Sequence, residues 1–195
     1  MGCIESRYSR LTCLSGENLE FLKANTGYDE ATIKESHKIF IKECPNGRLT
    51  PDKLLDLYEP FFCKGKAEQY CNHVFRTFDR DQNGFIDFEE FVLAMYVTSA
   101  GSAEEKLTWA FRMYDVDGNG VIDPDEMWKV VEAIYGMLCD DASKPTRSAK
   151  ERAMKIFYRM DENKDGHLTE EEFLRGCLED DELSKLLAPN MVECC

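Results

Sequence analysis

Apolar residues recur at helical spacing along most of the chain, and four segments rich in polar residues and glycine interrupt this pattern. Before three of these segments, two large apolar residues stand four positions and one position ahead of an aspartate, which places each pair on one helix face. The apolar pattern resumes after each segment, so it predicts an all-α protein of four helix–loop–helix units. The apolar pairs are Phe75 and Phe78, Phe111 and Tyr114, and Phe157 and Met160.

The four loops share an apolar residue at their eighth position. We expect these residues to form short two-residue β-ladders that pair loop one with loop two and loop three with loop four. The pairs define an N-terminal lobe over 17–99 and a C-terminal lobe over 100–178, with a flexible tail over 1–16 and a C-terminal helix or tail over 179–195. The residues at the eighth position are Leu49, Ile86, Ile122 and Leu168.

Loops two, three and four carry oxygen-bearing side chains at positions 1, 3, 5, 9 and 12, with a glycine at position 6. Ca²⁺ takes about six to eight oxygen ligands, and a twelve-residue loop of this spacing supplies them, using the backbone carbonyl of position 7 and both carboxylate oxygens of Glu at position 12. The His167 ring is an alternative ligand, but position 7 coordinates through its carbonyl, so we expect a solvated ring. The predicted ligands of three calcium sites are Asp79, Asp81, Asn83, Phe85, Asp87 and Glu90; Asp115, Asp117, Asn119, Val121, Asp123 and Glu126; and Asp161, Asn163, Asp165, His167, Thr169 and Glu172.

The first loop keeps the frame of the other three but lacks their ligands. With Gly47 at position 6, Cys44 falls at position 3. Positions 1 and 12 are Lys42 and Lys53, so two cations stand where carboxylates are needed. Pro45 fixes its own φ angle and lacks a donor where the loop has to wrap. We expect this loop to bind no Ca²⁺ and to retain its pairing with loop two.

Capping residues place several helix starts. Short helices are predicted over 17–24 and from Asp29 to about residue 42, ahead of the first loop. Pro51 and Pro124 stand at the first position of the helices that follow loops one and three. Capping boxes, in which each end of a four-residue segment bonds the backbone of the other, pair Ser102 with Glu105, Asp123 with Glu126 and Ser148 with Glu151.

Composition excludes several classes of protein. The formal net charge of −14 excludes a basic nucleic-acid interface, and a hydrophobic content of 43% supports a packed core. Nine cysteines lack metal-ligand spacing and follow no signal peptide, so we expect reduced thiols in a cytoplasmic protein. The histidines, His37, His73 and His167, stand in no catalytic motif, and we expect no enzymatic activity.

The N-terminus fits the myristoylation pattern M-G-x-x-x-[ST], with Gly2 as the acceptor and Ser6 at the last position. One myristoyl chain binds membranes only marginally, so stable anchoring needs a second signal. A palmitoylated Cys3 is a candidate for that signal, and Arg7 and Arg10 add attraction to anionic lipid. The alternative is an unmodified, frayed tail.

The chain resembles the neuronal calcium sensor family of EF-hand proteins from Gly2 to about Leu187. The silenced first loop over 42–47, the acylation signal, and the segments 78–84, 105–111 and 114–120 carry the resemblance. Three competent loops resemble the frequenin and cyclase-activating branches more than recoverin, whereas 25–28 is similar to the visinin-like branch, so the branch stays open. Ser36 and His37 depart from the family, which usually has a Trp-Tyr pair there.

The resemblance implies a calcium sensor at the membrane surface. Such a sensor exposes a hydrophobic groove for a helix of a target protein, and its acyl chain is either a constant anchor or part of a calcium–myristoyl switch. A cytosolic calcium buffer and a guanylate-cyclase-activating type of regulator are the alternatives. Mg²⁺ at resting calcium and a homodimer are further expectations.

Overall fold

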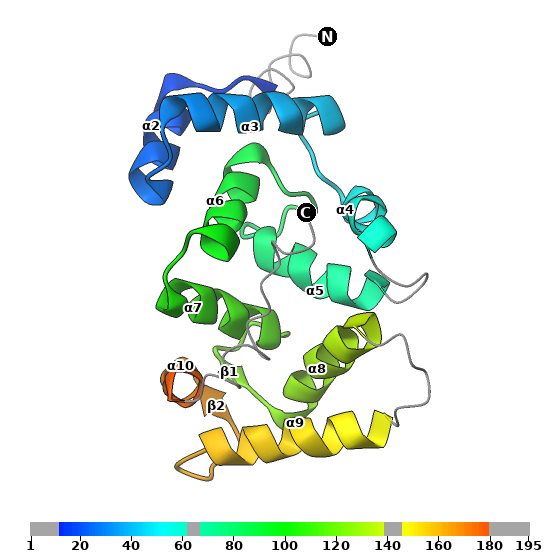
Figure 1. Ribbon diagram of the computed structural model, residues 1–195. Coiled ribbons are helices and arrows are strands. Elements are labelled where there is room, and N and C mark those ends of the chain that lie inside the picture. The colour runs from blue at the N-terminus through cyan, green and yellow to red at the C-terminus, as the bar shows by residue number, and fades with distance from the viewer. Residues whose placement is uncertain (1–11, 62–66, 139–145, 180–195) are drawn as a thin grey trace.

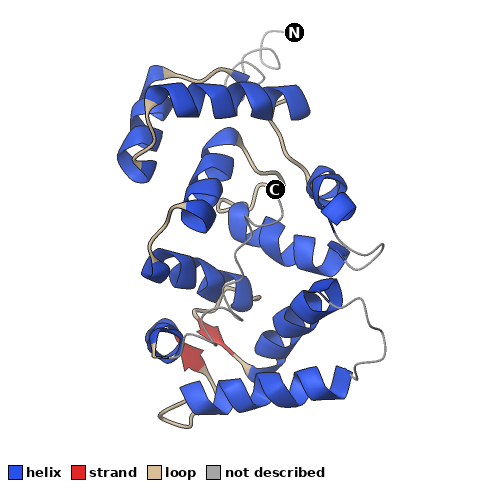
Figure 2. Ribbon diagram, in the orientation of Figure 1, coloured by secondary structure: helices blue, strands red, loops and turns tan. Residues whose placement is uncertain are grey.

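The computed structural model describes residues 12–61, 67–138 and 146–179, and helices make up most of it (Figures 1 and 2). Its elements confirm the all-α prediction. In chain order they are α2 (Gly16–Thr26), α3 (Glu30–Glu43), α4 (Pro51–Tyr58), the 3₁₀ turn η1 (Glu59–Phe61), α5 (Ala67–Phe78), α6 (Phe88–Ser99), α7 (Ala103–Tyr114), β1 (Val121–Ile122), α8 (Pro124–Leu138), α9 (Thr146–Met160), β2 (Leu168–Thr169) and α10 (Glu170–Leu178).

The loops pair as their eighth positions predict. In the second lobe, β1 and β2 form an antiparallel ladder in which Ile122 faces Leu168. In the first lobe the pairing is reduced to a single bridge, in which Leu49 and Ile86 exchange N–H···O bonds of 2.9 and 2.8 Å. All four side chains are buried. Each pair of loops is therefore fixed by one apolar contact and its backbone hydrogen bonds.

Helix starts follow the predicted caps. Asp29 accepts a first-turn N–H of α3, and α4 begins at Pro51 as predicted, with Thr50 as its cap. Ser102 and Glu105 form the reciprocal capping box at the start of α7. The Ser148 side chain, the predicted cap of the helix entering loop four, lies outside the described residues.

Helix α2 covers the first lobe by packing on α6. Ser15 caps its start, and Gly27 ends it with a φ of 67°, a left-handed conformation that glycine adopts without strain. Tyr28 then places its ring edge-on to Tyr96 of α6, with centroids 5.8 Å apart. At the other end of α2, the Asn18 amide donates to the Glu89 carboxylate. Polar and aromatic contacts thus tie α2 to the outgoing helix of loop two.

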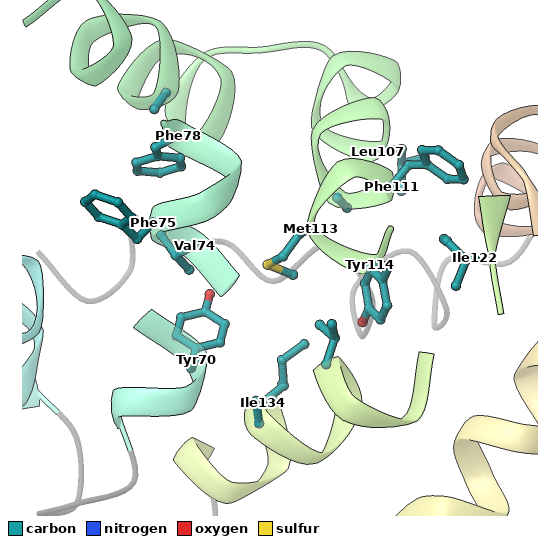
Figure 3. Close-up of a cluster of buried hydrophobic side chains, with 14 of the residues drawn as sticks. Tyr70, Val74, Phe75, Phe78, Leu107, Phe111, Met113, Tyr114, Ile122 and Ile134 are labelled. Carbon is teal, nitrogen blue, oxygen red and sulfur yellow. The ribbon is translucent and has the colours of Figure 1, made fainter. Parts of the chain in front are cut away.

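The apolar core runs continuously from one lobe into the other. Figure 3 shows Tyr70 and Val74 of α5 beside Met113 of α7, with Ile134 of α8 below them. These four side chains are at most 2% exposed. Close by on α5, burial and then the charges of Arg76 and Lys129 lower the pKa of His73 to about 4. Helix α5 therefore belongs to the first pair of units while packing against the second.

The connection between α6 and α7 leaves no room for a side chain at Gly101. A Cβ there would lie 2.6 Å from the Val97 carbonyl oxygen, a backbone atom that cannot move without displacing α6. We expect Gly101→Ala to lower the free energy of unfolding by about 1–3 kcal/mol, the usual cost of overpacking, as measured by denaturant unfolding.

Gly16→Ala is the matched control, because a Cβ at Gly16 meets nothing within 4 Å. Equal stabilities of the two variants would contradict a tight contact at Gly101.

Candidate metal sites

Each acidic loop folds around its first aspartate. In loop two, the Asp79 carboxylate accepts the N–H groups of Asn83 and Gly84 at 3.0 Å each. In loop three, the Asp115 carboxylate accepts the corresponding N–H groups at 3.1 Å each. The carboxylate at position 1 therefore sits inside the loop and organises the backbone around it.

In each loop, two residues with a left-handed backbone conformation turn the chain inward. The glycines at position 6 have φ angles of 83–87°, and the residues at position 4 have φ angles of 55–73°. Only glycine adopts such angles freely, yet position 4 is Gln82 in loop two and Lys164 in loop four. The loop fold tolerates strain at these two residues because the surrounding hydrogen bonds fix the turn. The position-6 residues are Gly84, Gly120 and Gly166.

The glutamate at position 12 joins the two ends of its loop. In loop three, Oε1 of Glu126 accepts the N–H groups of Val116 and Asp117 at 2.9 and 3.1 Å, while Oε2 accepts the N–H of Asp123 at 2.9 Å. Glu90 in loop two accepts the equivalent N–H groups. The carboxylate that is predicted to be bidentate is thus already held at the loop interior.

Position 9 doubles as the helix cap in all three loops. Asp87 and Thr169 form reciprocal capping boxes with the glutamate of their loop, at the starts of α6 and α10. The Asp123 carboxylate accepts the Glu126 N–H at 2.8 Å, as predicted. The sequence pattern singled out this arrangement in loop three only, although the same spacing is present in the other two loops.

Buried carboxylates make these loops fit a divalent cation. Positions 1 and 12 are 4–9% exposed in all three loops, and a buried carboxylate is costly unless it is hydrogen-bonded or neutralised. Carboxylate oxygens of positions 1, 3 and 12 converge to within 4.8 Å of one another in loops two and three. These hard oxygen clusters suit Ca²⁺, whereas the soft ligands that zinc prefers are missing from them. The clustered residues are Asp79, Asp81 and Glu90, and Asp115, Asp117 and Glu126.

Loop four carries an amide, Asn163, at position 3 in place of a carboxylate. Its Asp161 has one oxygen bonded to the Gly166 N–H at 3.1 Å, and the other is buried without a hydrogen-bond partner among the described residues. A buried, unpaired carboxylate oxygen points to a ligand that completes it. The His167 side chain at position 7 is exposed, in line with a solvated ring.

The remaining predicted ligands lie on the loops as their positions require. Phe85, Val121 and His167 occupy position 7, where the carbonyl is the expected ligand, and Val121 also belongs to β1. The side-chain oxygens of Asn83 and Asn119 accept the N–H of the position-7 residue at 3.0 and 2.9 Å. Asp165 in loop four makes the same bond to His167 at 2.9 Å.

The first loop differs from the others in its backbone as well as its ligands. Helix α3 continues to Glu43, at position 2 of the loop frame, whereas the other incoming helices end before position 1. Position 4 is Pro45, whose ring excludes the left-handed angle used there by the other loops. Lys53 at position 12 forms an ion pair with Glu43 at 3.7 Å, where the other loops hold a glutamate. Cys44 is buried, and burial raises the pKa of its thiol.

His37 replaces an aromatic residue that the family resemblance leads one to expect. Its ring packs edge-on against Phe88 at 4.7 Å, and Phe40 contacts the same Phe88 ring at 5.6 Å. Burial lowers the pKa of His37, which favours the neutral, more apolar ring. The substitution therefore retains an aromatic contact on this face of α3.

The predicted lipidation sites, Gly2 and Cys3, lie outside the described residues. Within the described ranges, Cys13, Cys44 and Cys71 are free thiols. Among the helices of the described ranges, none combines the length and the apolar character that a membrane span requires.

Comparisons with known proteins place the three acidic loops in one family. A model of the EF-hand domain pair matches residues 104–178, and a model of the EF hand domain matches residues 70–98. Neuronal calcium sensor 1 of Lymnaea stagnalis is 43% identical over 173 residues, which cover 88% of this chain and 91% of that protein. Recoverin of Homo sapiens is 38% identical over 183 residues, covering 92% of each, and visinin of Gallus gallus is 32% identical over 183 residues, covering 92% and 95%.

Two tryptophans flank loop three and provide a test of its ligands. Trp109 lies on α7 and Trp128 on α8, the helices that enter and leave the loop. We expect Glu126→Gln to remove one bound Ca²⁺ and most of the Ca²⁺-dependent change in tryptophan emission, because an amide offers one oxygen and no charge.

Glu90→Gln is the matched control in loop two. It should also remove one ion but a smaller part of the emission change, since both tryptophans flank loop three, whereas loop two is linked to Trp109 through the Phe78 ring at 5.4 Å. An unchanged emission response in Glu126→Gln would show that loop three is not the reported site.

Proposed function

Because the chain belongs to the neuronal calcium sensor family of EF-hand proteins, we propose that it is a calcium sensor that regulates a membrane-associated target protein. It binds Ca²⁺ at loops two, three and four through the eighteen predicted ligands, and the first loop stays empty. Ca²⁺ binding opens the helix pairs and exposes a hydrophobic groove that takes a helix of the target. Mg²⁺ occupies one or more loops at resting calcium.

The observation that carries this proposal is the continuity between metal loops and apolar core. The residue directly before each acidic loop is a buried core side chain, and so is the eighth residue of the loop. A ligand that moves the incoming or outgoing helix must therefore repack the core, because protein interiors are close-packed. The residues before the loops are Phe78, Tyr114 and Met160, and the eighth residues are Ile86, Ile122 and Leu168.

The first lobe also keeps apolar surface available for a partner. Four large apolar side chains, from four different helices, are 38–56% exposed. They belong to α2, α3, α4 and α6, which surround the first pair of loops. A target helix that covers any of them would gain about 25 cal/mol for each Å² of apolar area removed from water. The side chains are Phe21, Ile39, Leu57 and Met95.

A calcium buffer is the competing function, and it would bind the ion without opening. We expect the protein to be retained on a hydrophobic column in Ca²⁺ and to elute when a chelator is added. The doubly substituted Glu90→Gln, Glu126→Gln protein should elute earlier in Ca²⁺. Retention that is the same with and without Ca²⁺, in a protein that still binds the ion, would establish the buffer.

We further propose that Gly2 is myristoylated and that the acyl chain carries the protein to the membrane surface, with Cys3 as a second, palmitoylated anchor. Acylated protein should sediment with liposomes, and Gly2→Ala should remain in the supernatant. Sedimentation that requires Ca²⁺ indicates a calcium–myristoyl switch, whereas equal sedimentation with and without Ca²⁺ leaves a constant anchor and rejects the switch.

A further inference from the structure

Arg76 of α5 reaches out of the first lobe and binds the backbone of loop three. Its Nη1 donates to the carbonyl oxygens of Asp115, at 2.6 Å, and Val116. Its Nη2 donates to the carbonyl oxygen of Met113 at 2.7 Å and, at 3.5 Å, to that of Arg112. One guanidinium from the helix that enters loop two thus spans the end of α7 and the first two positions of loop three.

Two of these carbonyls, those of Arg112 and Met113, belong to the last turn of α7, and the other two belong to the first two positions of loop three. The last four carbonyls of an α-helix have no intrahelical N–H to accept, and they carry the negative end of the helix dipole. A guanidinium offers five donors in a rigid plane, and it stays charged at any physiological pH. Arg76 therefore donates hydrogen bonds to the free carbonyl groups at the C-terminal end of α7 and places a positive charge at the negative end of the helix dipole. A neutral side chain cannot do both.

The contact also reaches the calcium ligands. Val116 is held from both sides, because its carbonyl accepts from Arg76 while its N–H donates to Glu126. Burial lowers the pKa of Arg76, and three carboxylates of loop three oppose that shift through their charge. These carboxylates are Asp115, Glu126 and Asp117, all predicted ligands of the third site.

We propose that Arg76 is a positioning residue for loop three and that it couples Ca²⁺ binding at loop three to Ca²⁺ binding at loop two. Arg76 lies on α5 three residues before Asp79, the first predicted ligand of loop two, which directly follows the end of that helix. When the backbone at positions 1 and 2 of loop three shifts, the hydrogen bonds to the guanidinium transmit this displacement to α5. The inference rests on the proposed function, since it requires that both loops bind Ca²⁺.

The apolar interface around Arg76 makes the connection stiff. Phe78 packs on Trp109 at 5.4 Å, and Val74 lies beside Met113 in the buried cluster of Figure 3. The guanidinium therefore acts between two helices that cannot slide freely past each other. Coupling between two sites is reciprocal, so filling either loop should raise the affinity of the other by the same factor.

A double-mutant cycle on the full chain measures this coupling. Total Ca²⁺ affinity is measured by chelator competition in the unmodified protein, in Glu90→Gln, in Glu126→Gln and in the protein with both substitutions, with site four as a common background. We expect a coupling factor of about 5-fold or more, the usual lower range for linked sites. The cycle repeated with Arg76→Met should give a factor near one, and with Arg76→Lys an intermediate factor.

Arg112→Met is the matched control, because it removes an exposed cation from the same helix end and leaves the Arg76 bonds in place. It should keep the full coupling factor, which separates positioning from general electrostatics.

An Arg76→Met protein with undiminished coupling would overturn the inference, as would a coupling factor of one in the unmodified protein. Failure of Glu90→Gln and Glu126→Gln to remove bound Ca²⁺ would instead overturn the proposed function. Far-ultraviolet circular dichroism confirms that each variant is folded.

Discussion

Each acidic loop depends on the hydrogen bonds that the carboxylate at position 12 accepts from the loop backbone. In loops two and three it accepts N–H groups from the start of the loop with one oxygen and from the helix cap with the other. The same residue closes the loop, begins the outgoing helix and presents its charge to the interior. Burial of that charge is only partly offset by neutral N–H donors, and burial raises the pKa of Glu90. A divalent cation would neutralise the negative charge that the N–H donors leave uncompensated. Metal affinity is therefore linked to the fold of the loop.

The first loop shows what remains when that carboxylate is lost. Lys53 stands at position 12, α3 runs two residues further, and Pro45 blocks the left-handed turn at position 4. Leu49 still pairs with Ile86, so the lobe is closed by apolar contact and backbone hydrogen bonds without any metal ligand. Loop pairing therefore does not require the acidic ligand set, and the first loop still holds loop two through this bridge.

Local spacing explains why so much of this architecture could be predicted. Helix periodicity, capping boxes and the ligand order of a twelve-residue loop all repeat within a few residues, so sequence alone identifies them. The Arg76 contact could not be found in this way, because it joins residues 36–40 positions apart and no pattern distinguishes this arginine from a solvated one. The same holds for Tyr70 and Val74, whose spacing indicates a buried helix face but does not identify what covers it.

Helix α5 is shared between the two pairs of units. It packs on α4 within its own pair, on α7 and α8 of the other pair, and its end delivers Asp79 to loop two. If Ca²⁺ rearranges either pair, α5 has to move against one of its neighbours or carry that neighbour with it, since close-packed side chains leave little room to absorb a shift. A calcium buffer does not require such a shared helix, because its sites only have to bind the ion and need not be coupled. A sensor gains from it, because linked sites respond over a narrower range of calcium concentration than separate ones.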